Sequence, residues 1–242
     1  MKIAIHQANY FPYPGFFHKI NQADIFVIQD DVKFSKTTNR NKIISSSGST
    51  WINVPIEKGH QSLPIMDVKI NNETRWRKIT YKKICAGYNK AKFFHLYKDY
   101  FENLYKKEWE DIFELNFETI KHVLDWLDIK VKIIVESELD IPGQSTERLV
   151  NVCKKLGADT YISGIGGKRY LDEKLFKNNN VNLQYQNYTS ISYNQNLSKS
   201  FIPNLSIIDL LFNEGKDVAK EILQNSVVSS SGSIAMEDKQ DI

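Results

Sequence analysis

The chain has 242 residues, of which 41% are hydrophobic and 25% are charged, and its net charge is +3. That length is sufficient for one large or two small domains with a substantial hydrophobic core. The positive charges are spread along the chain without a basic arm, so nothing in the composition favours nucleic-acid binding.

Cysteine usage and apolar runs bear on the compartment. Cys85 and Cys153 are too few for a disulfide framework, which favours a reducing environment. No run approaches the roughly 18 apolar residues of a membrane helix, and Met1–Ile5 is too short for a signal peptide. We therefore expect a cytoplasmic protein that does not insert into a membrane.

The N-terminal part of the chain alternates short apolar runs with a helical segment. Residues 2–6 and 25–28 have the composition of buried strands, and a helix is predicted at about 15–22. Two such strands separated by a helix are typical of a βαβ unit in a parallel sheet. Residues 43–70 are expected to form short strands, with a turn at Ser45–Ser49.

The remaining chain is predicted to be helical first and then α/β again. Residues 73–128 have apolar side chains at helical spacing, and Gly87 is expected to end the first of these helices. The elements expected after this helical layer are a strand at 131–135, a helix capped at Ser145–Glu147 and stopped by Gly157, a strand leading into the glycine-rich loop of "YISGIGGKRYL", a helix at 168–177, a strand at 181–188, and a helix that begins at Asn204 or Ser206 and ends at Gly215.

Together these elements predict an α/β protein with a mostly parallel, Rossmann-like sheet and a helical insertion. Residues 1–224 are expected to form one α/β domain, with the helical layer at about 73–128. Residues 225–242 are rich in serine and polar residues, which is typical of a disordered tail.

Polar residues follow two of the predicted strands. His6, Gln7 and Asn9 come at the end of the first strand, and Asp30 and Asp31 follow the second. Ligands bind beyond the carboxyl ends of parallel strands, so we expect these side chains to share one edge, with His6 or Asp30 as a general base. The alternative is that His6 is a hydrogen-bonded core histidine and that Asp30 caps a turn.

Two further interpretations concern neighbouring residues. A pair such as Asp30–Asp31 suits Mg²⁺, which favours one or two carboxylates together with phosphate oxygens; a solvated turn is the alternative. His18 lies one helical turn beyond Gly15, and it is either a site residue or a half-buried helix histidine.

Three other groups of residues have the chemistry of a binding site. Arginine and asparagine in a loop suit an anion or a polyhydroxylated ligand, glycines let backbone N–H groups approach a phosphate, and tyrosines can stack on a sugar or a base. The candidates for these roles are Asn39, Arg40 and Asn41 in "SKTTNRNKI", Ser163, Gly164, Gly166, Gly167, Lys168 and Arg169 in the glycine-rich loop, and Tyr10, Tyr193 and Gln195.

Several motifs in combination resemble the WbqC-like protein family. They are "AIHQANYFPYPGFFHKINQADIFVIQDDVKFSKTTNRNKI", "YISGIGGKRYL" and "FIPNLSIIDLLFNEG", and the resemblance extends over residues 2 to about 224. It implies a role in making or decorating a bacterial surface polysaccharide such as O-antigen. The modification it implies is the acylation of an amino sugar with glycine or another amino acid.

A second resemblance is to the nucleotidylyl transferases and the pantothenate synthetases. It rests on a strand, a Pro/Gly turn that opens a helix, and the strand in "ADIFVI". It implies ATP with Mg²⁺ as cofactors, used to activate a carboxylate as an adenylate. Those enzymes have H-x-G-H at the turn, whereas this chain has Tyr13-Pro14-Gly15-Phe16, so His6 or His18 would have to substitute.

We therefore predict a transferase that forms an amide on a nucleotide-linked or lipid-linked amino sugar. Arg40, Lys168 and Arg169 would hold phosphate or carboxylate groups, and Tyr10 and Tyr193 would stack on the sugar or base. A homodimer is compatible with the sequence. The alternatives are a non-catalytic protein that binds a nucleotide sugar or acts as a scaffold, and a metal-dependent glycosyltransferase that uses Asp30 and Asp31.

Overall fold

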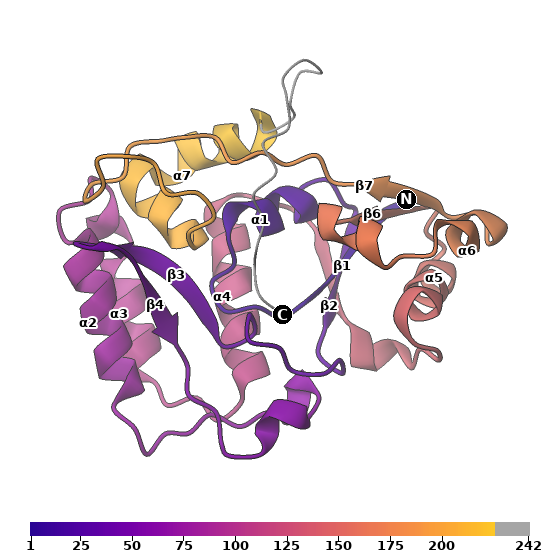
Figure 1. Ribbon diagram of the computed structural model, residues 1–242, viewed down its shortest axis with the longest axis horizontal. Coiled ribbons are helices and arrows are strands. Elements are labelled where there is room, and N and C mark those ends of the chain that lie inside the picture. Colours follow the sequence, from indigo (N-terminus) through magenta and orange to yellow (C-terminus); the bar gives the residue numbers. More distant parts are fainter. Residues whose placement is uncertain (226–242) are drawn as a thin grey trace.

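The computed structural model describes residues 1–225, which form an α/β structure around a five-stranded sheet (Figure 1). The strands of this sheet are β1 (Lys2–Gln7), β2 (Ile25–Gln29), β5 (Lys132–Val135), β6 (Thr160–Ser163) and β7 (Asn182–Tyr185). They run parallel in the order β5-β2-β1-β6-β7, so the N-terminal strand is central. The expected α/β class with a mostly parallel, Rossmann-like sheet is confirmed.

Both faces of the sheet are covered, which explains the near-continuous apolar runs in its strands. Side chains alternate between the two faces along a strand. Ala4 therefore packs in one core cluster, whereas Ile3 and Ile5 pack in the other. Cys153 belongs to this second cluster and is fully buried.

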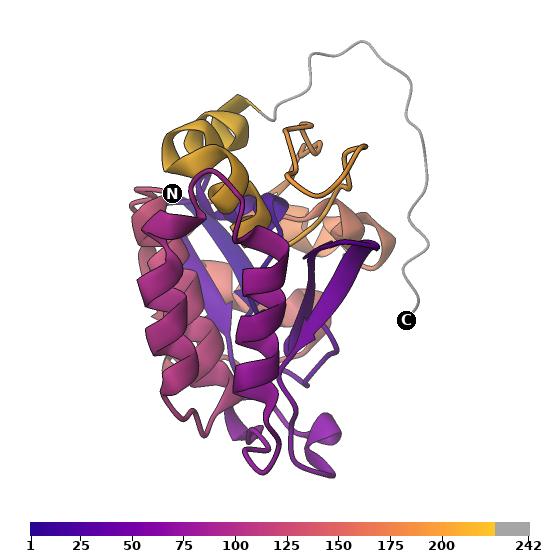
Figure 2. The ribbon, with the colours of Figure 1, turned by 90° about the vertical axis from the view of Figure 1, so that its left-hand side faces the viewer.

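The seven α-helices within residues 1–225 surround the sheet, and they divide unequally between its faces (Figures 1 and 2). Residues of α5 and α6 pack in the core cluster with Ile3 and Ile5, whereas the other helices contribute to the larger cluster with Ala4. Their bounds are α1 (Pro14–Ile20), α2 (Trp76–Tyr88), α3 (Lys98–Lys106), α4 (Ile112–Trp126), α5 (Ser145–Leu156), α6 (Glu173–Asn178) and α7 (Ile207–Asn225). The expected helical layer corresponds to α2, α3 and α4.

A separate antiparallel hairpin consists of β3 (Arg40–Ser45) and β4 (Gly48–Asn53). Its turn lies where the serine-rich stretch predicted one, and Gly48 takes a positive φ of 110° there. Short strands were expected throughout residues 43–70, and this is wrong for residues 66–70. Ile65–Asp67 form a 3₁₀ turn, and this stretch makes single bridges instead of a ladder.

Three glycines were expected to end helices, and one of them, Gly87, has a different role. Gly87 does not end its helix; it lies within α2, where an added Cβ would be 2.8 Å from the backbone oxygen of Ile44. It is therefore needed for the close approach of β3. Gly215 ends the helical run that begins at Ile207, as predicted: its angles (φ 78°, ψ 172°) are non-helical, and a second helical run, counted within α7, follows it to Asn225. Gly157 does end α5, in the left-handed conformation expected of it.

Two helix starts also differ from prediction. The N-cap of α5 is Gln144, which makes no side-chain capping bond, so the expected cap at Ser145 is wrong. The helix predicted at 168–177 is divided into a 3₁₀ turn at Ile165–Arg169 and the separate helix α6. Asp172 lies between them and is the N-cap of α6: its carboxylate accepts hydrogen bonds from the backbone N–H groups of Lys174 and Leu175.

None of the helices within residues 1–225 combines the length and the apolar character needed to cross a bilayer. The expectation of a disordered tail falls on residues 225–242, which lie outside the described residues apart from Asn225, the last residue of α7.

Candidate functional site

The strand order places a topological switch point between β1 and β6, and we call the sheet edge beyond the carboxyl ends of these two strands the crevice. The chain moves outward from β1 through β2 to β5 on one side, and from β6 to β7 on the other. Such a reversal is the topological switch point at which open parallel sheets bind their ligands. β1 ends at Gln7 and β6 ends at Ser163, so the segments that follow these two residues border the expected ligand site.

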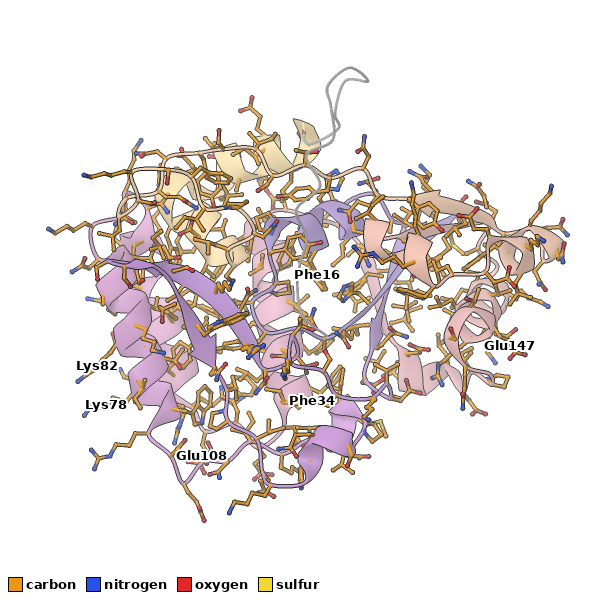
Figure 3. The ribbon with its side chains drawn as sticks, viewed as in Figure 1. Phe16, Phe34, Lys78, Lys82, Glu108 and Glu147 are labelled. Atoms are coloured by element: carbon orange, nitrogen blue, oxygen red, sulfur yellow. The ribbon has the colours of Figure 1, made fainter. Side chains whose placement is uncertain are left out.

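His6 lies at this end of the central strand. Its Nδ1 is 3.0 Å from the backbone oxygen of Gln7, and its ring packs edge-on against Phe16, with 4.9 Å between ring centroids. Phe16 projects from α1 near the centre of the molecule (Figure 3). Because a carbonyl oxygen only accepts, Nδ1 carries the proton and Nε2 is left as an acceptor. Burial, followed by the positive charge of Lys19, lowers the pKa of His6 to about 3, so the ring is neutral at pH 7.

Gln7 and Asn9 are held by the segment that precedes the hairpin. Gln7 Nε2 donates to Ser35 Oγ at 2.8 Å and to Thr37 Oγ1 at 3.0 Å. Thr37 Oγ1 in turn donates to Asn9 Oδ1 at 3.4 Å. The structure thus brings together two predicted residues and two hydroxyls that the sequence reading missed. "SKTT" carried no signal of its own beyond its polarity.

A buried asparagine joins the same two segments from the helical side. Asn116 on α4 donates to the backbone oxygens of Ala8 at 2.8 Å and Thr38 at 2.7 Å. These bonds fix the loop after β1 against residues 35–38. The helical layer therefore positions the rim of the crevice, although none of its residues was among the predicted site residues.

Asn39, Arg40 and Asn41 face the hairpin and the N-terminal loop. Asn39 donates to Val54 O at 2.8 Å, and Asn41 donates to Phe11 O at 2.5 Å. The guanidinium of Arg40 lies 4.4 Å above the ring of Trp51. Both asparagine side chains are thus engaged with backbone carbonyls, and the contact that the structure gives to Arg40 is a cation–π contact on the hairpin.

The glycine-rich loop follows β6 on the other side of the crevice. Ser163 is buried and donates to Gly164 O at 3.0 Å. A Cβ on Gly167 would lie 2.2 Å from Ser163 Oγ, whereas a Cβ on Gly164 or Gly166 would meet nothing within 4 Å. Gly167 is therefore required for packing, and the other two glycines present open backbone.

The larger side chains of this loop are exposed to solvent. Lys168 places its Nζ 5.1 Å from the ring centroid of Tyr185 on β7, and Arg169 is exposed. Ile165 and Tyr170 are 60% and 67% exposed, which is unusual for side chains of their size. The loop thus offers cationic, aromatic and apolar groups beside the crevice.

Asp30 and Asp31 follow β2 at the same sheet edge, but both are engaged by protein partners. The carboxylate of Asp30 accepts from Ser137 N at 3.0 Å and from Ser137 Oγ at 2.6 Å. Asp31 forms an ion pair with Arg148 of α5, which also pairs with the buried Glu136. The sequence reading missed Arg148, because nothing local links it to β2.

These contacts bear on the expected Mg²⁺ site. A guanidinium beside Asp31 repels a second cation. Within the described part of the chain, no three histidine, cysteine or acidic side chains converge as metal ligands. The donor set around Asp30 and Asp31 does not fit Mg²⁺, so we derive no step through a metal there.

His18 links α1 to the segment after β7. Its Nδ1 accepts from Gln186 Nε2 at 2.7 Å, and Gln186 also donates to Gly15 O at 2.6 Å. The ring of Tyr188 lies 5.3 Å from that of His18. His18 is 3% exposed, and burial lowers its pKa. His18 is therefore a neutral, hydrogen-bonded histidine behind the first turn of α1.

The three remaining candidates lie in the core of the helical side. Tyr10 is fully buried, and its hydroxyl bonds the hydroxyl of Tyr105. Tyr193 Oη and Gln195 Nε2 each donate to Asp209 Oδ2 at 2.8 Å. Asp209 is therefore a buried carboxylate with partners in the core. The structure does not bring Tyr10 to the crevice.

Lys19 is a further residue that the sequence reading missed. It lies on α1 and is 3% exposed, and its Nζ donates to Ile5 O in β1 at 3.0 Å. Burial lowers its pKa to about 7. The available signal was its position in a short helix whose residues are otherwise apolar or histidine, with no acidic side chain in the helix to pair with it.

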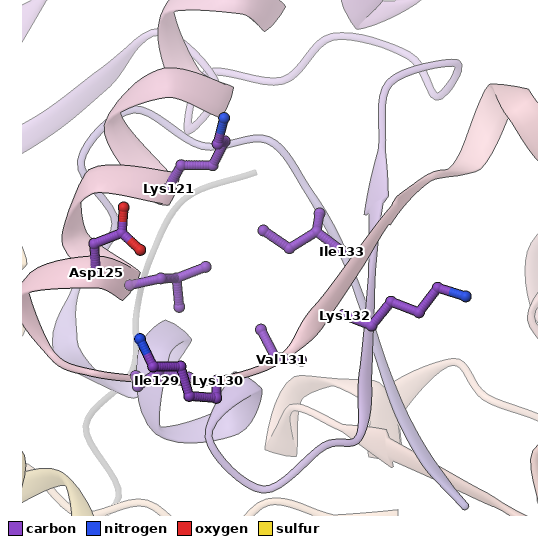
Figure 4. A pocket seen from close by; sticks show the side chains of 8 residues that line it. Lys121, Asp125, Ile129, Lys130, Val131, Lys132 and Ile133 are labelled. Atoms are coloured by element: carbon purple, nitrogen blue, oxygen red, sulfur yellow. The ribbon is translucent and has the colours of Figure 1, made fainter.

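Two cavities lie elsewhere on the molecule. One, of about 430 Å³, lies where α4 ends and β5 begins, between Lys121, Lys130 and Lys132 (Figure 4). The start of β5 is at the amino edge of the sheet, opposite the crevice. The other, of about 410 Å³, lies between α2 and α3 and is lined by residues that include Arg75, Lys78 and Tyr81. Figure 3 shows Lys78 on the outer side of α2.

Comparison with known proteins gives one family and one relative. The chain matches the WbqC-like protein family over residues 7–221. It is also similar to the uncharacterized protein Rv1507c of Mycobacterium tuberculosis, with 31% identity over 220 residues, which cover 89% of this chain and 95% of the relative. No solved structure matches the chain significantly.

Proposed function

This chain belongs to the WbqC-like protein family, and from that premise we propose that it is a transferase of bacterial surface-polysaccharide synthesis. Its substrate is a nucleotide-linked or lipid-linked amino sugar, and its reaction acylates the sugar amine with glycine or another amino acid. The proposal joins what the sequence motifs imply to the chemistry of the crevice between β1 and β6.

His6 carries this proposal. It lies at the carboxyl end of the central strand, at the switch point, and its Nδ1–H is committed to Gln7 O. Its Nε2 makes no hydrogen bond with the described residues. A histidine with a fixed tautomer and an unoccupied nitrogen at a ligand crevice has the geometry of a general base.

The proposed reaction uses that nitrogen directly. The sugar amine attacks the carbonyl carbon of an activated acyl group, a C–N bond forms, and the leaving group departs with the electrons of its bond to carbon. The attacking nitrogen becomes acidic as it gains positive charge, and its proton passes to His6 Nε2. The ring is neutral at pH 7, so Nε2 holds the lone pair that this step requires.

The glycine-rich loop supplies the phosphate-binding part of the proposal. Gly164 and Gly166 leave the backbone open to a ligand at the start of the 3₁₀ turn Ile165–Arg169, where backbone N–H groups can approach a phosphate. Lys168 and Arg169 add positive charge next to them. On the opposite side, the amide oxygen of Gln7 and the amide nitrogen of Asn9 suit sugar hydroxyls, because Ser35 and Thr37 bind only the other atom of each amide.

The alternatives receive less support from the same geometry. A metal-dependent glycosyltransferase needs free carboxylates, whereas Asp30 and Asp31 are bound by Ser137 and Arg148. Asp30 is for the same reason a weaker candidate for the base than His6. A non-catalytic protein that binds a nucleotide sugar would have the same crevice, and it is distinguished by experiment.

A His6→Gln variant tests the proposal. The wild-type protein is screened by thermal shift against UDP-, dTDP- and GDP-linked amino sugars and against ATP with Mg²⁺. It is then assayed for amide formation with a panel of activated amino acids. We expect the variant to keep ligand stabilisation and to lose turnover by about 10²-fold or more. The matched control is His95→Gln, at an exposed histidine of the helical layer.

Full turnover by the His6→Gln variant would remove His6 from the mechanism. Binding of a nucleotide sugar without amide formation, by any donor in the panel, would favour the non-catalytic alternative. Stabilisation by ATP with Mg²⁺ would favour activation of the amino acid as an adenylate.

A further inference from the structure

The peptide groups of β1 point alternately to its two neighbours, and this locates Lys19. Ala8 N donates to Gln29 O at the end of β2, whereas Met1 O accepts from Thr160 N at the start of β6. Even-numbered residues therefore point their backbone groups towards β2, and odd-numbered residues point theirs towards β6. Ile5 O belongs to the second set, so it faces the crevice between β1 and β6.

The ladder between these strands ends before it reaches that carbonyl. The last paired residues are Ala4 and Ile162, and the chain leaves the sheet at Gly164. Lys19 Nζ takes the place of the missing strand partner and donates to Ile5 O at 3.0 Å. Its ammonium group therefore lies at the point where β1 and β6 separate, which is the floor of the crevice.

Lys19 lacks a counter-charge in this position. Lysines are almost never fully buried without a partner, yet no carboxylate of the described residues lies within ion-pair distance of Nζ. Its hydrogen-bond partner is a neutral carbonyl that uses one of three donors. Burial penalises the ammonium, as the lowered pKa of Lys19 reflects. A negative charge in the crevice would compensate it.

We propose that Lys19 anchors the diphosphate of the ligand at the floor of the crevice. The inference rests on the proposed function, because it takes the crevice as the ligand site, and it deepens that function by assigning the anionic part of the substrate to one residue. In a poorly solvated site the field of an ammonium extends over several ångströms with little screening. A diphosphate links the sugar both to a nucleotide and to a lipid carrier, so this anchor would serve either kind of substrate.

The test compares Lys19→Met with wild type in binding inorganic pyrophosphate, measured by isothermal titration at constant ionic strength. Methionine matches the length of the stem and lacks the charge. We expect the variant to bind pyrophosphate about tenfold or more weakly, as the loss of one charged contact would cause. The matched control is Lys82→Met, at an exposed lysine on the outer side of α2 (Figure 3), which should leave the affinity unchanged.

A second measurement detects ligand binding in the wild-type protein alone. In wild-type protein with ¹³C-labelled lysine, pyrophosphate should shift the Lys19 side-chain resonance at constant pH, and the Lys19→Met spectrum identifies that resonance. An unmoved Lys19 resonance at saturating pyrophosphate would overturn the proposal. Equal affinity of wild type and a folded Lys19→Met variant would do the same, as would failure of the wild-type protein to bind pyrophosphate.

Two further probes separate this inference from the proposed function and distinguish the two substrate sources. They are UDP-N-acetylglucosamine and farnesyl diphosphate in detergent micelles. Equal binding of a nucleotide sugar by both proteins would refute the role of Lys19 and leave the function standing. Lys19-dependent binding of pyrophosphate without binding of either larger probe would support the anchor and count against the function.

Discussion

Two buried polar groups, Asp209 on α7 and Lys19 on α1, differ in how completely the protein satisfies them. The carboxylate of Asp209 accepts hydrogen bonds from Tyr88, Tyr193 and Gln195, each at 2.8 Å. The ammonium of Lys19 has one bond, to a carbonyl of β1. Burial shifts the pKa of both groups towards the neutral form, upwards for Asp209 and downwards for Lys19.

The difference separates a structural role from a functional one. A buried polar group with all its partners specifies the packing around it. Asp209 does so by joining α2, α7 and the segment between β7 and α7. A buried charge without compensation costs stability, and such a cost is typical of sites that meet a ligand. The region around Lys19 and His6 therefore has the character of a binding site, whereas the Asp209 cluster has the character of a protein core.

Asp209→Ala should have the largest effect on stability. It leaves three buried donors without an acceptor, so we expect a loss of at least about 3 kcal/mol in the free energy of unfolding. Urea denaturation measures this loss. The control is Asp217→Ala, an exposed position on the same helix, which should change stability by about 0.5 kcal/mol or less. An unchanged free energy of unfolding for Asp209→Ala would show that the Asp209 cluster does not support the fold.

Lys19→Met should raise the free energy of unfolding instead of lowering it, and the size of this gain should depend on pH. The pKa of Lys19 is lowered from 10.5 to about 7 by burial, so between these values the unfolded chain binds the proton and the folded chain does not. Wild-type stability must therefore rise with pH in this window, and the penalty is constant below about pH 7.

The expected size follows from the slope of one proton. Relative to Lys19→Met, the wild-type protein should gain about 2 kcal/mol between about pH 7.5 and pH 9, since one pKa unit corresponds to about 1.4 kcal/mol. Chemical denaturation of the two proteins at both pH values measures the difference. Parallel pH profiles would mean that Lys19 is fully charged and solvated in the folded protein.

The smallest expected effects on stability concern Gly166 and Gly167, two adjacent glycines of the loop after β6. An added Cβ on Gly167 would clash with Ser163 Oγ, whereas one on Gly166 would meet open space. Gly167→Ala should therefore lower stability by about 1–2 kcal/mol, and Gly166→Ala by about 0.5 kcal/mol or less. Gly166→Ala should instead weaken pyrophosphate binding. Thermal unfolding and titration of both variants test the pair, and equal stability losses would contradict the packing role of Gly167.

The elements that the sequence predicted well are those whose signal is local. The apolar runs of β1 and β2, the helix stop at Gly157 and the serine turn before Gly48 depend on neighbours in the chain. The helix stop at Gly215 is local in the same way. Gly87 was misread for the opposite reason, because its role is decided by the backbone of Ile44, which is distant in the sequence.

The site shows the same limit. His6, Gln7 and Asn9 could be placed at a sheet edge because they directly follow a strand. Lys19 and Asn116 could not be found, since their roles depend on which carbonyls the fold leaves without a strand partner. Tyr193 was predicted to stack on a sugar or base because it is aromatic. Its hydroxyl instead bonds Asp209, which lies on a helix that composition alone could not place beside it.

The central claim is that ligands bind in the crevice between β1 and β6. Amide chemical-shift mapping with ¹⁵N-labelled protein and pyrophosphate tests it most directly. We predict that the largest shifts fall on Gln7, Asn9, Gly164 and Gly166, which border the crevice. Shifts confined to Arg75 and Lys78, or to Lys121 and Lys130, would place the anion in one of the two other cavities and contradict the account.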